Sequence, residues 1–160
     1  MNKDAYPVTP AVRVLRAHKV DFLPHLYSYE EHGGTAVSSD ALNVPEHQVI
    51  KTLIMEDEDK VPLIVLMHGD KEVSTKTLAR FLHKKTIQPC DPAVAQKHSG
   101  YQVGGTSPLG TKKTMPVYME KTIAALPILY INGGKRGFLV SLTPKDLIRL
   151  VNPILVEAAV

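Results

Sequence analysis

The sequence predicts an α+β fold built on a mixed, largely antiparallel β-sheet that is flanked by helices. Segments with helical spacing of apolar residues stand beside strand-like runs of branched apolar residues. The two kinds of segment do not alternate regularly, as they would in a doubly wound fold. The chain has 160 residues, 44% of them hydrophobic, which is the size and balance of one ordinary domain. We therefore expect residues 1–160 to form a single domain around one core.

Composition excludes several classes of protein. The twelve prolines and ten glycines are spread along the chain and form no low-complexity block, which excludes disordered and collagen-like proteins. No apolar stretch approaches the roughly 20 residues of a membrane span, and the first ten residues lack an apolar signal region. We therefore expect a cytoplasmic protein with no membrane partner. The net charge of +3 permits a nucleic acid partner without requiring one.

Two helices should begin at Thr-Pro pairs. Thr9 and Thr143 can cap free amides, while Pro10 and Pro144 stand at the first helical position, where a missing N–H costs nothing. Other helices are expected over residues 74–85, with Leu78, Phe81 and Leu82 on the buried face, from Asp91 to near Gly100 and, for a turn or two, over 38–43.

The strands are predicted from runs of branched apolar residues. Residues 49–55 (VIKTLIM) and 61–67 (VPLIVLM) are joined by an acidic segment, which is typical of a hairpin with a charged tip. Further strands are expected over 115–119, 128–131 and 138–142, the last two joined by a glycine-rich turn at 132–137.

Two glycine-rich segments could bind a ligand through backbone amides. In residues 103–110 (VGGTSPLG), paired glycines permit positive φ and a close approach of another molecule. A phosphate-binding P-loop is excluded because Thr111 stands where the lysine belongs, and Ser107 lacks the glycine pattern of a nucleophile elbow. A tight surface loop is the alternative here, and a solvated hairpin loop is the alternative at residues 132–137.

Lys51 is the unusual residue of its strand. Period-2 geometry places it on the same face as Val49, Leu53 and Met55, so its stem should run along apolar surface. A lysine on an edge strand can serve only to prevent aggregation. The functional alternative is a partly desolvated ammonium that donates to a carbonyl or sugar oxygen.

The remaining candidates favour a protein without a metal. The seven histidines show no zinc-binding spacing, and Cys90 is the only cysteine, so no multi-cysteine site is available. No basic residue adjoins Cys90 in the sequence, which favours an inert thiol. We therefore predict neither a metal nor another cofactor.

Four motifs together resemble the YbaK/EbsC family, freestanding relatives of the editing domain of bacterial prolyl-tRNA synthetase. They are Thr-Pro-Ala at 9–11, Lys-Thr-Leu at 51–53, Gly-Tyr-x-Val-Gly-Gly-x-Ser-Pro-Leu-Gly at 100–110 and Gly-Gly-Lys-Arg-Gly at 133–137. The similarity runs from about residue 9 to about residue 152. It implies a barrel-like editing-domain sheet and an aminoacyl-tRNA deacylase that hydrolyses Cys-tRNA(Pro), with tRNA(Pro) and the synthetase as partners.

The resemblance also implies the site. Lys51 is implied as the catalytic residue, and the attacking group as water or the thiol of the substrate, whose cyclisation would make the reaction lyase-like. Tyr27 corresponds to the family's tyrosine, although Tyr29 lies close enough to be the alternative. Asn132 replaces a serine that is common in the family, and this leaves alanine open as the amino acid removed. A noncatalytic module that binds tRNA or the synthetase is the alternative class. The implied substrate-binding residues are Tyr27, Thr52, Gly104, Gly105, Asn132, Gly133 and Gly134.

Overall fold

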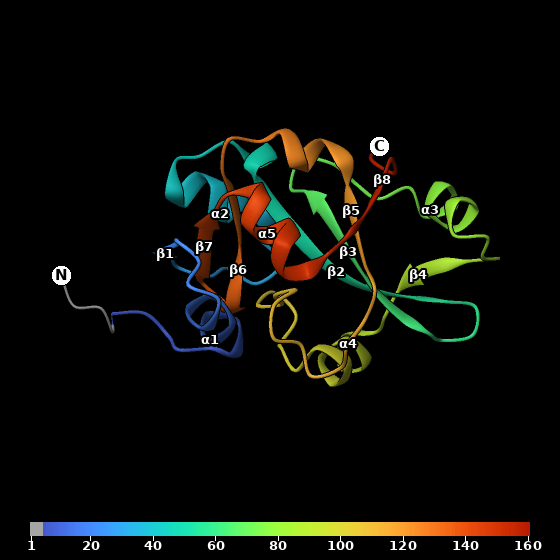
Figure 1. Ribbon diagram of the computed structural model, residues 1–160, viewed down its shortest axis with the longest axis horizontal. Coiled ribbons are helices and arrows are strands. Elements are labelled where there is room, and N and C mark those ends of the chain that lie inside the picture. Colours follow the sequence, from blue (N-terminus) through green and yellow to red (C-terminus); the bar gives the residue numbers. More distant parts are fainter. Residues whose placement is uncertain (1–4) are drawn as a thin grey trace.

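The computed structural model describes residues 5–160, which form an eight-stranded sheet with helices on both faces (Figure 1). The strands follow the spatial order β1-β7-β6-β2-β3-β5-β8, and β4 pairs with a second stretch of β2. The strands are β1 (Leu23–Leu26), β2 (Val49–Asp57), β3 (Pro62–His68), β4 (Ile87–Pro89), β5 (Val117–Glu120), β6 (Leu129–Lys135), β7 (Phe138–Leu142) and β8 (Ile154–Val156).

The sheet is mixed, as the sequence predicts. Four pairs of strands are antiparallel, namely β1–β7, β6–β7, β2–β3 and β2–β4. Three pairs are parallel, namely β2–β6, β3–β5 and β5–β8. The α+β class is therefore confirmed, and β2 lies in the interior of the sheet with neighbours on both sides.

The two Thr-Pro helices begin as expected. The Thr9 hydroxyl accepts a hydrogen bond from the Val12 amide at 3.1 Å, and the Thr143 hydroxyl accepts one from the Asp146 amide at 3.2 Å. The α-helices are α1 (Pro10–Ala17), α2 (Gly34–Leu42), α3 (Thr75–Phe81), α4 (Pro92–Ser99) and α5 (Pro144–Val151), and two 3₁₀ turns, η1 (Glu46–Gln48) and η2 (Lys121–Ala125), join strands.

The core is divided between the two faces of the sheet. Along β3, Ile64 and Leu66 belong to a large cluster that contains residues of α1, β6 and β7. The alternating Leu63 and Val65 belong to a smaller cluster under α3. Because both faces are covered, all seven residues of β3 are buried.

One expected helix is shorter than predicted and carries a different buried face. The helix predicted over 74–85 is capped by Ser74, ends at Phe81 and turns away at His83, whose φ is +56°. Leu78 is fully buried, but Phe81 is 51% exposed, so the assignment of Phe81 to the buried stripe was wrong. The turn expected over 38–43 is part of a longer helix, α2.

The last hairpin also differs from the prediction. The strand expected over 128–131 continues through Gly133 and Gly134 to Lys135, with an irregularity in register between Asn132 and Lys135. The loop expected over 132–137 is therefore only a two-residue turn, Arg136–Gly137. The strand expected over 115–119 begins two residues later, and the short strands β1, β4 and β8 were not predicted.

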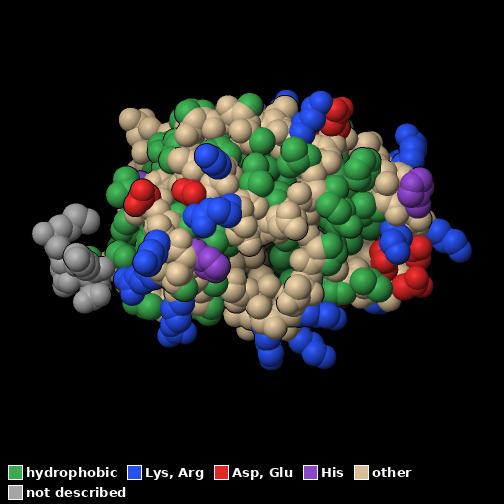
Figure 2. All heavy atoms as spheres, in the orientation of Figure 1, with side chains coloured by type: hydrophobic (Ala, Val, Ile, Leu, Met, Phe, Trp, Pro, Cys, Tyr) green, Lys and Arg blue, Asp and Glu red, His purple; other side chains and the backbone are tan. Residues whose placement is uncertain are grey.

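The basic side chains are distributed over the surface visible in Figure 2. On the face shown in Figure 2, the lysine and arginine side chains are spread over the molecule and do not gather in a single patch. None of the helices within residues 5–160 is long and apolar enough to cross a membrane.

Candidate functional site

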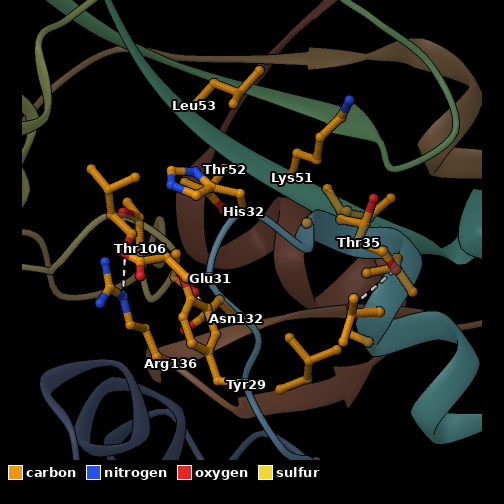
Figure 3. Close-up of a pocket in the computed structure, with 18 of the residues that line it drawn as sticks. Tyr29, Glu31, His32, Thr35, Lys51, Thr52, Leu53, Thr106, Asn132 and Arg136 are labelled. Carbon is orange, nitrogen blue, oxygen red and sulfur yellow. Dashed lines mark hydrogen bonds between the residues drawn. The ribbon is translucent and has the colours of Figure 1, made fainter.

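A cavity of about 530 Å³ opens beside β2. Its walls come from the segment after β1, the start of α2, residues 49–54 of β2, the loop at 103–106 and the turn after β6 (Figure 3). This volume falls within the usual range for small-molecule sites. Both glycine-rich segments that the sequence indicated as possible ligand-binding loops contribute residues to this one cavity.

The cavity follows an interruption in the sheet. On the side of β2 away from β3, strand β6 pairs only with Val49 and Ile50, and β4 pairs only from Met55 onward. The Cys90 amide donates to the Ile54 carbonyl at 3.0 Å across the same edge. Backbone groups alternate between the two edges of a strand, so the N–H and C=O of Thr52 also point to this edge. Among residues 5–160, no strand pairs with Thr52 at this edge.

Thr52 also brings an unpaired hydroxyl to the cavity. Its Oγ1 atom is buried, and it is the single buried side-chain nitrogen or oxygen within residues 5–160 that lacks a hydrogen-bond partner. Such a buried group costs about 1–3 kcal/mol unless something satisfies it. Thr52 therefore offers an incoming molecule a backbone donor, a backbone acceptor and a hydroxyl group.

The two glycine-rich segments are fastened to each other. Asn132 donates from Nδ2 to the Gly104 carbonyl at 3.0 Å, while its Oδ1 accepts from the amides of Gly134 and Lys135 at 2.7 and 3.1 Å. A Cβ atom at Gly105 would lie 2.7 Å from the backbone nitrogen of Arg136, so the two backbones touch there. Asn132 thus holds one wall of the cavity in place.

Both candidate tyrosines line the cavity, but they differ in their contacts. The amide of Tyr27 donates to the Gly137 carbonyl at 2.9 Å, and burial raises the pKa of its hydroxyl. Tyr29 lies against Gly104, where a Cβ atom would approach the Tyr29 hydroxyl to 2.5 Å. Gly104 itself has φ +91°, so a side chain at that position would be both strained and obstructed.

Lys51 lines the cavity with its stem, while its ammonium points away from Asn132 and Arg136 (Figure 3). Nζ lies 3.4 Å from the Glu72 carboxylate; the Lys51 side chain is 19% exposed and that of Glu72 is 82% exposed. Leu53 and Met55 on the same face belong to the smaller core cluster or pack against it, as period-2 geometry predicts. Because β2 is an interior strand, the interpretation of Lys51 as an edge-strand lysine does not hold.

Several of the predicted substrate-binding residues do not line the cavity and lie deeper in the protein. Gly105, Gly133 and Gly134 are absent from its lining. A Cβ atom at Gly133 would collide with the Phe138 ring, so this glycine is needed for packing. The surface-loop interpretation of residues 103–110 is also wrong, because residues 105–109 are buried.

No protein nucleophile is evident among the residues of the cavity. Ser107 is fully buried behind the loop, and its hydroxyl accepts from the Leu109 amide at 3.1 Å. Cys90 lines the cavity, but burial, together with the neighbouring Glu56 carboxylate, raises the pKa of its thiol to about 12. The thiol is therefore protonated at neutral pH.

One cluster of metal-ligating side chains, which sequence spacing did not reveal, occurs within residues 5–160. His47, His68 and Asp70 lie together at the ends of η1 and β3. The Nδ1 atom of His68 lies 2.7 Å from the carbonyl of His47 and must donate to it, while Nε2 lies 2.7 Å from the Thr122 hydroxyl. The two imidazoles are stacked at 3.7 Å and 6°, whereas the ligands of zinc converge on one point. The arrangement suits a hydrogen-bonded structural pair.

Sequence reasoning missed Arg136 as a residue of the cavity. Its guanidinium stacks on the Tyr29 ring at 4.9 Å, and its Nε donates to the Val103 carbonyl at 2.9 Å. The only available signal was its place inside the Gly-Gly-Lys-Arg-Gly motif. Thr106 and Leu139 also line the cavity and had no separate signal in the sequence.

Comparison with protein families and known proteins gives a consistent result. The family model described as the aminoacyl-tRNA editing domain matches residues 30–150. EbsC of Enterococcus faecalis, named as a candidate Cys-tRNA(Pro)/Cys-tRNA(Cys) deacylase, is 26% identical over 145 residues, which is 90% of this chain and 88% of EbsC. The proline–tRNA ligase of Thermodesulfovibrio yellowstonii is 31% identical over 100 residues, covering 61% of this chain but only 16% of the ligase.

The fold is also found among solved structures. The crystal structure of a candidate trans-editing enzyme for prolyl-tRNA synthetase matches with a TM-score of 0.82 over 96% of this chain and 99% of that chain. The sequence identity is 18%, so this likeness concerns the fold.

Proposed function

The chain belongs to the aminoacyl-tRNA editing domain family, and from this premise we propose that it is an aminoacyl-tRNA deacylase that hydrolyses mischarged Cys-tRNA(Pro) in trans. The 160 residues would act as one editing domain in the cytoplasm, with tRNA(Pro) as the nucleic acid partner. The similarity to proline–tRNA ligases supports the synthetase as a further partner.

The open edge at Thr52 is the observation that carries this proposal. An aminoacyl ester presents a carbonyl oxygen, an α-ammonium and ribose oxygens, all of which need hydrogen-bond partners when water is excluded. Thr52 offers an unpaired buried hydroxyl and two unpaired backbone groups, with the backbone of Gly104 across the cavity. The site can therefore hold the charged 3′ end of a tRNA by hydrogen bonds that remain unmade in its absence.

In the proposed reaction the Thr52 amide donates to the ester carbonyl, whose oxygen becomes more negative in the transition state. Water, or the thiol of a cysteine substrate, forms a bond to the carbonyl carbon. The bond from that carbon to the ribose oxygen breaks, and the proton of the attacking group ends on the ribose hydroxyl. Attack by water yields free cysteine, whereas attack by the thiol yields a cyclic thioester.

Lys51 is proposed to stabilise the ribose or carbonyl oxygen. Its present partner, Glu72, is largely exposed, and exposed ion pairs contribute only about 0–1 kcal/mol. The four-carbon stem can therefore leave Glu72 and turn the ammonium toward the bound ester. Tyr27, Asn132 and the glycines of both segments are proposed to shape the surrounding wall and fix its backbone groups.

The test compares release of cysteine from Cys-tRNA(Pro) by the wild type, by Lys51→Ala and by the exposed control Lys71→Ala. We expect Lys51→Ala to lose about a hundredfold or more in kcat/KM, in keeping with the loss of a transition-state donor, and the control to resemble the wild type. Equal rates for all three would remove Lys51 from the reaction.

A panel of substrates identifies the amino acid and the class of protein. It uses cysteinyl, alanyl and seryl esters on tRNA(Pro) and on their own tRNAs, each in excess over the enzyme. Preference for alanine would assign the site to a different small residue. Retention of every ester intact after binding would identify a noncatalytic tRNA-binding module.

A further inference from the structure

Arg136 is held at the rim of the cavity in a geometry that leaves part of its guanidinium free. Its backbone belongs to the two-residue turn between β6 and β7, pressed against Gly105. Its Nε donates to the Val103 carbonyl at 2.9 Å, and its Cζ atom lies over the Tyr29 ring, 4.9 Å from the ring centroid (Figure 3). The two Nη atoms have no hydrogen-bond partner among residues 5–160.

The charge of Arg136 is not neutralised by a neighbouring acid. Glu30 and Glu31 line the same cavity, but neither lies within ion-pair distance of Arg136. Lys51, the other lysine or arginine that lines this cavity, contacts the Glu72 carboxylate, whereas Arg136 forms no ion pair within residues 5–160. Arg136 thus presents a fixed, half-buried and uncompensated positive charge beside the site.

We propose that Arg136 binds a phosphodiester group of the RNA next to its 3′-terminal nucleoside. This inference rests on the proposed function. It adds a second subsite, in which a cationic side chain binds an anionic group of the RNA. Two free Nη donors on one planar group match the paired oxygens of a phosphate, and the hydrogen bond to Val103 together with the cation–π contact to Tyr29 restrains the guanidinium in advance. The stack itself contributes about 0.5–1 kcal/mol at a partly exposed site.

Arg136 lies where the first phosphate of a bound RNA would leave the cavity. The aminoacylated nucleoside occupies the cavity along Thr52, and the chain of the RNA must leave through the opening of that cavity. The phosphate on the 5′ side of the terminal nucleoside is the first charged group outside it. Arg136 lines the cavity beside Val103, which is 41% exposed, so this part of the wall reaches solvent.

The experiment uses three cysteine esters that differ in phosphate content. They are the ester of adenosine, which has no phosphate, the ester of the dinucleotide CpA, which has one, and Cys-tRNA(Pro). The variants are Arg136→Met, Arg136→Lys and Tyr29→Leu, with Arg80→Met on the exposed surface of α3 as the control for loss of one positive charge.

We expect Arg136→Met to raise KM for the dinucleotide and tRNA esters by about tenfold or more, which matches the loss of a hydrogen bond to a charged group. The rise for the adenosine ester should be clearly smaller. The salt dependence of log kcat/KM for tRNA should become shallower by about 0.7, the value for one contact to a single strand. Arg136→Lys and Tyr29→Leu should give intermediate effects, because the first keeps the charge and the second keeps the guanidinium.

Two outcomes would overturn the proposal: an equal rise in KM for all three esters, or no rise for any of them. Thermal unfolding of each variant shows whether it is folded, and Arg136→Lys provides the comparison if Arg136→Met does not fold. A wild-type protein that hydrolyses none of the three esters would instead refute the proposed function. The two failures are therefore distinguishable.

Discussion

The Asn132 side chain donates to the Gly104 carbonyl at 3.0 Å and so joins two glycine-rich segments that are 28 residues apart in the sequence. The same side chain accepts two amides of its own turn. One residue therefore fixes both the shape of a turn and the position of the opposite wall of the cavity.

Asn132→Asp should separate these two roles. The carboxylate can still accept from Gly134 and Lys135, but it cannot donate to Gly104 and would face that carbonyl as a second acceptor. We expect kcat/KM for the aminoacyl ester to fall about tenfold, which corresponds to one lost hydrogen bond. Deacylation kinetics measure this loss. Gln96→Glu, on the exposed side of α4, is the matched amide-to-acid control, and an equal loss there would contradict the interpretation.

Thr52→Val should lower activity without lowering stability. The unpaired hydroxyl is replaced by a methyl group of similar shape, so the free energy of unfolding should stay constant or rise by about 1 kcal/mol. The loss of a substrate contact should reduce kcat/KM at least about tenfold. Denaturant unfolding and deacylation kinetics provide the two measurements.

Thr35→Val is the matched control for the effect of Thr52→Val on the free energy of unfolding. The Thr35 hydroxyl donates to the Glu46 carboxylate at 2.7 Å and lies 3.2 Å from the Gly69 carbonyl. Its removal should therefore destabilise the protein by about 1–2 kcal/mol. If both threonine variants lost stability to the same extent, the Thr52 hydroxyl would have a partner after all.

Asp57→Asn should be strongly destabilising, since the Asp57 carboxylate is buried and holds the hairpin tip. It accepts from the amides of Asp59 and Val61 at 2.8 and 3.0 Å and contacts the Lys84 ammonium at 3.2 Å. The amide of asparagine keeps one acceptor but loses the charge, so we expect a cost of about 2–3 kcal/mol. Denaturant unfolding at neutral pH measures it, and a cost below that of Thr35→Val would count against this role.

Stability should decrease in mildly acidic solution because of His68. Burial lowers the pKa of its imidazole below 6.5, so between that lowered value and 6.5 the unfolded chain binds more protons than the folded one. The free energy of unfolding should therefore be constant above about pH 7 and fall as the pH decreases through this window. His68→Gln should show a shallower fall when unfolding is measured between pH 7 and 5. An unchanged slope would assign the effect to His25 or His98, whose pKa values are also lowered by burial.

Cys90 should react slowly with an alkylating reagent. With a pKa of about 12, its thiolate is rarer at pH 8 than that of an ordinary cysteine by a factor on the order of a thousand. Labelling by iodoacetamide should therefore be slow in the folded protein and become fast in denaturant. Mass spectrometry follows the reaction, and rapid labelling of the folded protein would contradict the raised pKa.

The sequence was sufficient for features that depend on local chemistry. The Thr9 and Thr143 caps, the hairpin of β2 and β3, and the side chain of Lys51 on the face of Leu53 were all predicted and are present. The exposed Phe81 was assigned incorrectly because α3 ends sooner than its apolar spacing suggests. The strands β4 and β8 are three residues long, too short for a periodic pattern to appear, and are formed by pairing with distant segments.

In the site, too, the sequence indicated which residues matter but not the contacts that depend on distant segments. Thr52 and Asn132 were named from the resemblance, but periodicity could not reveal that the Thr52 hydroxyl is unpaired or that the Asn132 amide is directed to Gly104. Arg136 was missed because its significance depends on Tyr29, which lies 107 positions earlier in the sequence and meets it only through the pairing of β1 with β7.

The interruption between β6 and β4 also bears on self-association. Unpaired strand edges commonly template the addition of a strand from another molecule, which is a first step toward fibrils. Here the exposed stretch of β2 is bounded at each end by a strand that already pairs with it, so a foreign segment cannot extend along it. The stretch of β2 between these two strands is too short for a second polypeptide to pair along it, so the protein keeps an unpaired backbone edge at Thr52 that does not promote aggregation.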